Sequence, residues 1–161
     1  MIKAGNNLPD GAVMVMEEAA PKKIAVSELL GDKKSIIFGV PGAFTPSCSA
    51  KHLPGYASEY ENFTKLGIDL IGCIAVNDIF VMDNWSKNTD PENKIKMLAD
   101  GNADYIKKMG LEWDASEFGL GLRCLRFALL LEGVKVKDIF VEEVPSHVNV
   151  TAASNILKVL S

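Results

Sequence analysis

The residues best suited to do chemistry form one short stretch, Val40-Pro41-Gly42-Ala43-Phe44-Thr45-Pro46-Ser47-Cys48. Thr45 followed by Pro46 is a typical helix start, because threonine can cap a helix and proline fits its first position. Cys48 then lies in the first turn, where unpaired backbone N–H groups and the helix dipole stabilise a thiolate. Since the thiolate is the nucleophilic form, we interpret Cys48 as a reactive thiol rather than as a buried apolar side chain.

The spacing around Cys48 separates two kinds of thiol chemistry. Enzymes that exchange disulfides carry C-x-x-C at such a helix start, whereas here Thr45 stands in place of the first cysteine. A single thiol one turn from a hydroxyl suits attack on a small electrophile that needs hydrogen bonding, and a hydroperoxide fits that description. Negative charge grows on the departing oxygen during such an attack, so the site also requires a cation.

Arg123 and Arg126 are the candidate cations, and their spacing does not choose between them. If both lay on one regular strand, they would point to opposite faces and only one could approach Cys48. His52 follows Cys48 by four residues, so it lies on the same helix face. A Cys48–His52 nucleophile pair is disfavoured, because a thiol already acidified by a helix start and an arginine has less need of a base, so we expect His52 to give a supporting hydrogen bond or packing. A zinc site is disfavoured too, because no cluster supplies further ligands. His147 is expected in a surface loop.

The elements that must position these residues alternate between strands and helices. The sequence predicts strands over Ala12–Met16, Ser35–Val40, Ile68–Val76, Ile95–Ala99, Arg126–Leu131 and Val134–Val141. It predicts helices from Thr45 to Gly67, with a kink near Leu53 caused by Pro54, and over Ile79–Lys87, Asn102–Met109 and Thr151–Leu160. A two-residue turn at Glu132-Gly133 would join the last two strands. This order predicts an α/β, thioredoxin-like three-layer sandwich with a central mixed sheet, built as one domain over residues 1–161.

Composition narrows the function classes. The chain has 161 residues, 48% of them hydrophobic and 24% charged, with a net charge of −4. This balance is that of a compact protein without a membrane span, and the negative charge disfavours binding to nucleic acid or anionic lipid. Three cysteines at wide spacing favour a reducing compartment over a disulfide scaffold. The first residues lack the features of a secretory or transit signal, so we expect a cytoplasmic protein or an already processed organellar form.

The motifs around the thiol are highly specific when taken together. The stretch Pro41-Gly42-Ala43-Phe44-Thr45-Pro46-x-Cys48-Ser49, followed by His52-Leu53-Pro54-Gly55, closely resembles the active-site motif of the peroxiredoxins, in the version of the peroxiredoxin 5 (type II) subfamily. The likeness continues through Val76-Asn77-Asp78 and Gly119-x-Gly121-x-Arg123-x-x-Arg126-Phe127-Ala128. By motif position, the resemblance implies that Pro41, Thr45, Cys48 and Arg126 surround the peroxide.

The resemblance also implies an activity and partners. The expected enzyme reduces hydrogen peroxide and alkyl hydroperoxides through a sulfenic acid at Cys48, which an external thiol then reduces. Glutathione with glutaredoxin, or thioredoxin, is the expected reductant, and no metal or organic cofactor is implied. The family further suggests a homodimer packed near the active-site loops. A thiol-disulfide oxidoreductase and a non-catalytic redox sensor of the same fold remain the alternatives.

The resemblance leaves open how the sulfenic acid is resolved. Some peroxiredoxin 5 members carry a resolving cysteine in the loop before the final helix, and residues 146–152 contain none. Cys73 falls inside an apolar strand, where burial should raise its pKa and where a helix-start thiol rarely comes within disulfide range. Cys124, beside Arg123, is the less unfavourable partner. We therefore predict a one-cysteine mechanism.

Overall fold

The structure is a computed structural model, and it describes all residues, 1–161. The strands are β1 (Ala12–Glu17), β2 (Ala20–Ala25), β3 (Lys34–Gly39), β4 (Leu70–Ala75), β5 (Lys96–Ala99), β6 (Glu112–Asp114), β7 (Leu122–Cys124), β8 (Phe127–Glu132) and β9 (Lys135–Val141). The helices are α1 (Val26–Leu30), α2 (Leu53–Ser58), α3 (Tyr60–Lys65), α4 (Ile79–Thr89), α5 (Asp104–Met109) and α6 (Ala153–Leu160). A π-helical turn covers Cys48–His52, and a 3-10 turn covers Ser116–Phe118. No helix is long and apolar enough to cross a membrane.

Seven strands form one mixed sheet in the order β2-β1-β5-β4-β3-β8-β9. The central strands β3, β4 and β5 run parallel, and the flanking pairs are antiparallel. Strands β6 and β7 form a separate two-stranded sheet. The parallel centre follows from the β-α-β-α-β order of the chain, since parallel neighbours need a crossover connection. The thioredoxin-like mixed sheet expected from the sequence is therefore confirmed.

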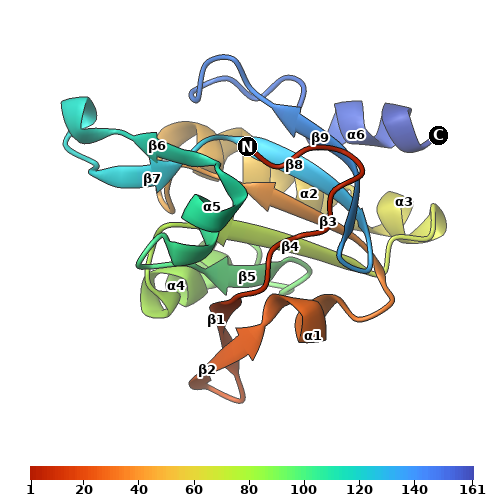
Figure 1. The fold of residues 1–161 in the computed structure, drawn as a ribbon, viewed down its shortest axis with the longest axis horizontal. Helices are drawn as coiled ribbons and strands as arrows, with labels where there is room; N and C mark the ends of the chain where they lie inside the picture. The colour runs from red at the N-terminus through yellow and green to blue at the C-terminus, as the bar shows by residue number, and fades with distance from the viewer.

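Helices cover both faces of the sheet and give it three layers (Figure 1). Side chains of β3 alternate between two cores: Ile36 and Phe38 pack with α2, α3, α4 and α6, and Ile37 packs with α1 and α5. In Figure 1 the N-terminal segment, drawn in red, crosses the face that α5 covers. Ile2 N donates to Met109 O there at 2.8 Å. Both faces of the central strands are thus buried, as their continuous apolar sequences predict.

Two local predictions need correction. Strand β2, helix α1 and the short pair β6–β7 are absent from the elements predicted from the sequence. Strand β2 is an edge strand with only Ile24 buried, so it lacks a clear apolar pattern. The turn of the last hairpin lies at Gly133-Val134 rather than Glu132-Gly133, since Glu132 pairs with Lys135. Gly133 has φ 55°, the left-handed conformation that such a turn requires and that glycine adopts without strain.

Candidate active site

The loop that carries Cys48 leaves the centre of the sheet. Strand β3 ends at Gly39, and Val40 N still donates to Ile74 O of β4 at 3.1 Å. Helical residues begin at Pro46, and Thr45 O accepts the first helical hydrogen bond, from Ser49 N at 3.0 Å. The predicted helix start at Thr45-Pro46 is therefore confirmed. The hydroxyl of Thr45 donates to Gly42 O at 2.7 Å and accepts no hydrogen bond from a helical N–H, so it does not cap the helix.

The turn after Cys48 is wider than an α-helical turn. Cys48–His52 forms a π-helical turn, closed by a hydrogen bond from Leu53 N to Cys48 O. Pro54 stands one residue later and has no N–H to donate, so a regular α-helical ladder is interrupted here. The kink predicted near Leu53 is realised as this π turn. It keeps Cys48 and His52 side by side, both buried, on the face that packs against the sheet.

Arg126 reaches the thiol from the other half of the chain. Its Nη2 donates to Cys48 Sγ at 3.0 Å, its Nη1 lies 2.9 Å from His52 Nδ1, and its Nε donates to Pro145 O at 2.8 Å. Arg126 is only 2% exposed, and none of the three salt bridges in the protein includes it. A buried cation without a carboxylate partner favours a thiolate beside it, because the two charges then compensate each other.

His52 accepts a hydrogen bond from Arg126 because its ring stays neutral. Burial, and secondarily the charge of Arg126, lowers the pKa of His52 to about 3. The Nε2–H then donates to Thr151 O at 3.2 Å, which leaves Nδ1 as the acceptor for Arg126. The structure thus places His52 as a hydrogen-bonding support of Arg126, in agreement with the supporting role expected for it, and a neutral ring adds no second charge at the guanidinium.

The lowered pKa of His52 gives a testable pH dependence of stability. In the unfolded chain His52 binds a proton with the ordinary pKa of 6.5, whereas in the folded protein the pKa of His52 is about 3. The unfolded state binds more protons between these values, so the free energy of unfolding must fall as pH falls. We expect a loss of roughly 2.5 kcal/mol at about pH 4.5 relative to about pH 7.5 from this group alone.

Urea unfolding at the two pH values, for the wild type and for His52→Asn, measures this loss. Asparagine keeps an acceptor for Arg126 and does not titrate, so the variant should lose less stability on acidification than the wild type does. An equal acid-induced loss in the two proteins would contradict the neutral, buried state of His52.

Pro41 and Thr45 line a pocket together with Arg126. The pocket has a volume of about 510 Å³, and its walls include Trp113, Phe118, Leu120, Val144 and Pro145. Cys48 has no exposed surface, and Arg126, a residue of the pocket wall, contacts its sulfur through the guanidinium. The structure therefore brings together the four predicted site residues, Pro41, Thr45, Cys48 and Arg126.

Arg123 lies near the same loop but has a different set of partners. It belongs to β7, and Leu125 separates that strand from Arg126, so the two arginines do not share a regular strand as the spacing argument assumed. Arg123 Nη1 lies 3.4 Å from Pro41 O, and its Nε donates to Leu120 O at 2.9 Å. A Cβ on Gly42 would lie 2.7 Å from Arg123 Nη1, so a larger residue there would displace the end of the Arg123 side chain.

The other two thiols, those of Cys73 and Cys124, are buried and have raised pKa values, which disfavour the reactive thiolate. Cys73 lies within β4, between Phe38 of β3 and Met97 of β5, and burial raises its pKa well above the ordinary value. Burial also raises the pKa of Cys124, whose thiol donates to Val40 O at 3.1 Å. The burial predicted for Cys73 is confirmed. All three cysteines are free thiols.

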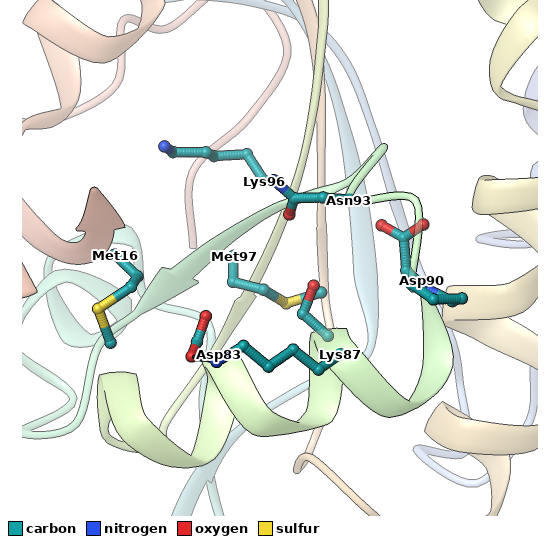
Figure 2. Close-up of a pocket in the computed structure, with 9 residues that line it drawn as sticks. Met16, Asp83, Lys87, Asp90, Asn93, Lys96 and Met97 are labelled. Atoms are coloured by element: carbon teal, nitrogen blue, oxygen red, sulfur yellow. Dashed lines mark ion pairs between the residues drawn. The ribbon is translucent and has the colours of Figure 1, made fainter. Parts of the chain in front are cut away.

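A second pocket lies apart from these residues, between α4 and β5 (Figure 2). Its volume is about 280 Å³, and Asp83 and Lys87 form an ion pair of 2.8 Å in its wall. Met16 and Met97 also border it. It holds no thiol and none of the predicted site residues, so the pocket lined by Pro41, Thr45 and Arg126 is the candidate active site.

The fold and the site define a class of protein: a thioredoxin-like α/β sandwich that holds one cysteine at a helix start, beside a buried arginine. Comparison with known proteins narrows this class. The redoxin family matches residues 3–159. Peroxiredoxin-2B of Arabidopsis thaliana is 46% identical over 161 residues, covering 99% of this chain and 98% of the relative.

Solved structures agree with these relatives. Reduced Prx3 of Vibrio vulnificus in complex with H2O2 matches with a TM-score of 0.94 and 39% identity over 100% of both chains. The Plasmodium falciparum antioxidant protein, a 1-Cys peroxiredoxin, matches with a TM-score of 0.93 and 32% identity, covering 99% of this chain and 98% of that chain. Peroxiredoxin 5 of Alvinella pompejana matches with a TM-score of 0.88 and 34% identity over 99% of this chain and 98% of that chain.

The chain belongs to the peroxiredoxins, in the type II group, and is a thiol-dependent peroxidase. The family, the fold class and the enzyme class predicted from the sequence are confirmed. As a thiol-dependent peroxidase, it has peroxides as its substrates.

Two residues that support the site could not be predicted from the sequence. Glu142 and Thr151 flank the loop before α6, and Thr151 O accepts hydrogen bonds from His52 Nε2 at 3.2 Å and from Tyr56 OH at 2.6 Å. Glu142 Oε2 accepts from the Thr151 hydroxyl at 2.7 Å. A lone glutamate and a lone threonine carry no motif, so no pattern in one sequence could have indicated this connection.

Proposed function

We propose that Cys48 is the peroxidatic cysteine and that it reduces hydrogen peroxide and small alkyl hydroperoxides. The contact of 3.0 Å between Arg126 Nη2 and Cys48 Sγ carries this proposal. Arg126 is buried and has no carboxylate partner, so the sulfur is the group beside it that can carry the compensating negative charge. The Vibrio vulnificus relative, whose crystal structure is a complex with H2O2, supports the choice of substrate.

The reaction begins with attack of the Cys48 thiolate on the terminal oxygen of the hydroperoxide. An S–O bond forms while the O–O bond breaks, so the sulfur is oxidised to a sulfenic acid and the peroxide is reduced. The departing alkoxide or hydroxide takes a proton and leaves as an alcohol or as water. Arg126 lies where it can stabilise both the thiolate and the negative charge on that oxygen.

Thr45 and Pro41 complete the peroxide site in this proposal. The Thr45 hydroxyl gives its proton to Gly42 O at 2.7 Å, so its oxygen remains free to accept a hydrogen bond from the O–H of the peroxide. This arrangement would orient the terminal oxygen toward Cys48. Pro41 is buried at the pocket wall and has no N–H, so it would shield the sulfur from water without competing for hydrogen bonds.

We also propose that the sulfenic acid is resolved by an external thiol, in a one-cysteine mechanism. Residues 146–152 contain no cysteine, and both Cys73 and Cys124 have raised pKa values because they are buried. A thiol from glutathione, glutaredoxin or thioredoxin would attack the sulfenic sulfur, release water and form a mixed disulfide, which a second thiol then reduces. The match to a 1-Cys peroxiredoxin supports this choice.

Mass spectrometry after one equivalent of hydrogen peroxide tests this mechanism. We expect a single sulfenic acid, trapped by dimedone and located at Cys48, with Cys73 and Cys124 still reduced in a non-reducing digest. An abundant disulfide between Cys48 and either partner would overturn the one-cysteine mechanism, and an unmodified Cys48 would overturn its assignment as the peroxidatic residue.

A homodimer that covers the mouth of the site is part of the same proposal. Large apolar side chains are exposed around the pocket and the adjoining turns, namely Phe44 (51%), Phe80 (65%), Phe118 (66%) and Val144 (43%). Ala43 N donates to Asn77 Oδ1 at 2.9 Å, which holds the turn before Phe80 against the active-site loop. Of these, Phe118 and Val144 line the pocket itself, and exposed apolar side chains at a pocket suit burial by a second copy. A purely monomeric sedimentation profile at micromolar concentration would contradict this assembly.

The residue at position 45 disfavours the alternative function, that of a thiol-disulfide oxidoreductase. Thr45 occupies the place of the first cysteine of a C-x-x-C pair, so no dithiol can form in this helix turn. We therefore expect little reduction of insulin disulfides by this protein. The three free, buried thiols further support a reducing compartment such as the cytoplasm.

A further inference from the structure

The segment between β9 and α6 provides hydrogen-bond acceptors for three residues of the site. Pro145 O accepts from Arg126 Nε at 2.8 Å, and Ser146 O accepts from Ser47 Oγ at 2.9 Å. Further along, Thr151 O accepts from His52 Nε2 at 3.2 Å. These carbonyls lie on a backbone loop, so the positions of the guanidinium and the imidazole depend on where that loop is held.

Glu142 closes this loop from inside. It is only 5% exposed, and its Oε2 accepts from Asn149 N at 2.8 Å, from Thr151 N at 2.9 Å and from the Thr151 hydroxyl at 2.7 Å. Its own N–H donates to Arg126 O at 3.0 Å. One carboxylate therefore joins the two ends of the loop 143–150, and its backbone is fixed directly to Arg126.

The carboxylate of Glu142 serves these hydrogen bonds and not an ion pair. None of the three salt bridges in the protein includes it. Burial alone would raise the pKa of Glu142, but the hydrogen bonds from Thr151 and Asn149 outweigh burial and lower it. Glu142 is therefore ionised at neutral pH, and hydrogen bonds to an ionised acceptor are about twice as strong as neutral ones.

We propose that Glu142 is a positioning residue of the peroxidase reaction, which acts through Thr151, His52 and Arg126 on the Cys48 sulfur. Each link is a direct contact: Glu142 to Thr151, Thr151 to His52, His52 to Arg126 and Arg126 to Cys48. If the loop opened, Arg126 Nε would lose its acceptor, Pro145 O. His52 would lose its contact with Thr151 O and would no longer be held in place as the acceptor for Arg126 Nη1. The inference rests on the proposed function, because the positioned group is the arginine at the peroxidatic thiol.

Glu142→Gln tests the proposal, since glutamine keeps the size of the side chain and loses its charge. We expect the second-order rate constant for hydrogen peroxide to fall at least about tenfold. The hydrogen bonds that close the loop are weakened when their charged acceptor is replaced by a neutral amide. The rate of Cys48 alkylation by iodoacetamide, located by mass spectrometry, should fall in parallel. Thr151→Val removes only the hydroxyl contact and should cost about two- to tenfold in each rate.

Glu143→Gln is the matched control. Glu143 is the neighbouring carboxylate in the same segment, but its side chain is exposed and takes part in no hydrogen bond or salt bridge. The peroxide rate constant and the Cys48 alkylation rate of Glu143→Gln should therefore equal those of the wild type. All rates are measured well below the thermal unfolding midpoint of each variant, so that unfolded protein does not contribute.

The two rates separate the possible failures. Wild-type values for both rates in Glu142→Gln and Thr151→Val, even with a lowered melting temperature, would overturn the proposal, because Glu142 would then only stabilise the loop. If the wild type itself did not reduce peroxide, the proposed function would fail, and the alkylation rate would still decide whether Glu142 positions Arg126 against the thiol.

Discussion

Replacing Cys48 by serine is expected to abolish peroxide reduction, with a loss of ~10³-fold or more in the rate constant. Serine keeps the shape of the side chain, but its hydroxyl is neither ionised at neutral pH nor oxidised by peroxide. Arg126 would retain a hydrogen-bond acceptor in the variant, so the fold and the pocket should persist. Stopped-flow measurement of hydrogen peroxide consumption, with circular dichroism as a check on folding, gives the answer.

The double variant Cys73→Ala, Cys124→Ser is the control for that experiment. Alanine avoids placing a hydroxyl in the apolar core at Cys73, and serine at Cys124 can still donate to Val40 O, the contact that the thiol makes at 3.1 Å. We expect this variant to keep the wild-type rate constant within about threefold. Substantial activity in Cys48→Ser, or its loss only in the double variant, would move the chemistry to another thiol.

Removal of the Arg126 guanidinium is the second large effect that we expect. Arg126→Met should lower the peroxide rate constant by about 10²- to 10³-fold, the cost of losing one preorganised donor at a developing oxyanion. Methionine fills similar space but carries no charge, so the thiolate would lose its neighbouring cation. The rate constant for hydrogen peroxide and the rate of Cys48 alkylation should both fall.

Arg123→Met is the matched control for Arg126→Met. Arg123 donates to the backbone carbonyls of Pro41 and Leu120 and makes no contact with the sulfur, so its removal should cost less than about tenfold. Lost hydrogen bonds to Pro145 and His52 would also destabilise Arg126→Met, so both variants are compared at equal folded fractions. A larger loss in Arg123→Met than in Arg126→Met would contradict the assignment.

Much of the architecture was predictable because local patterns and tertiary packing agree. Three local patterns each indicate a single structure: the apolar run of β3 indicates a buried strand, Thr45-Pro46 a helix start, and Gly110 the end of α5. The edge strand β2 was not predictable, because Pro21, Lys22 and Lys23 face solvent and leave no apolar periodicity. Its existence depends on pairing with β1, which the local sequence does not encode.

Some residues of the site were likewise predictable from the sequence, and others were not. Cys48 was predictable from its own neighbours, because a proline-started helix explains both its position and its reactivity. Arg126 could not be distinguished from Arg123 by spacing, since the chain passes from β7 to β8 at Leu125 and the assumed single strand does not exist. That choice came from the family motif. The acceptor role of His52 depends on its contacts with Arg126 and Thr151, which lie 74 and 99 positions away in the sequence, and Glu142 is connected to the site through that same contact between His52 and Thr151.

The most direct test of the central claim counts the peroxide molecules that each chain consumes. The purified protein is given excess hydrogen peroxide with either glutathione and glutaredoxin or the thioredoxin system. A peroxidase that works through a Cys48 sulfenic acid should consume peroxide until the reductant is exhausted, and prior alkylation of Cys48 should stop it. Consumption of about one peroxide per chain, followed by no further turnover with any thiol reductant, would identify a stoichiometric redox sensor and contradict the account.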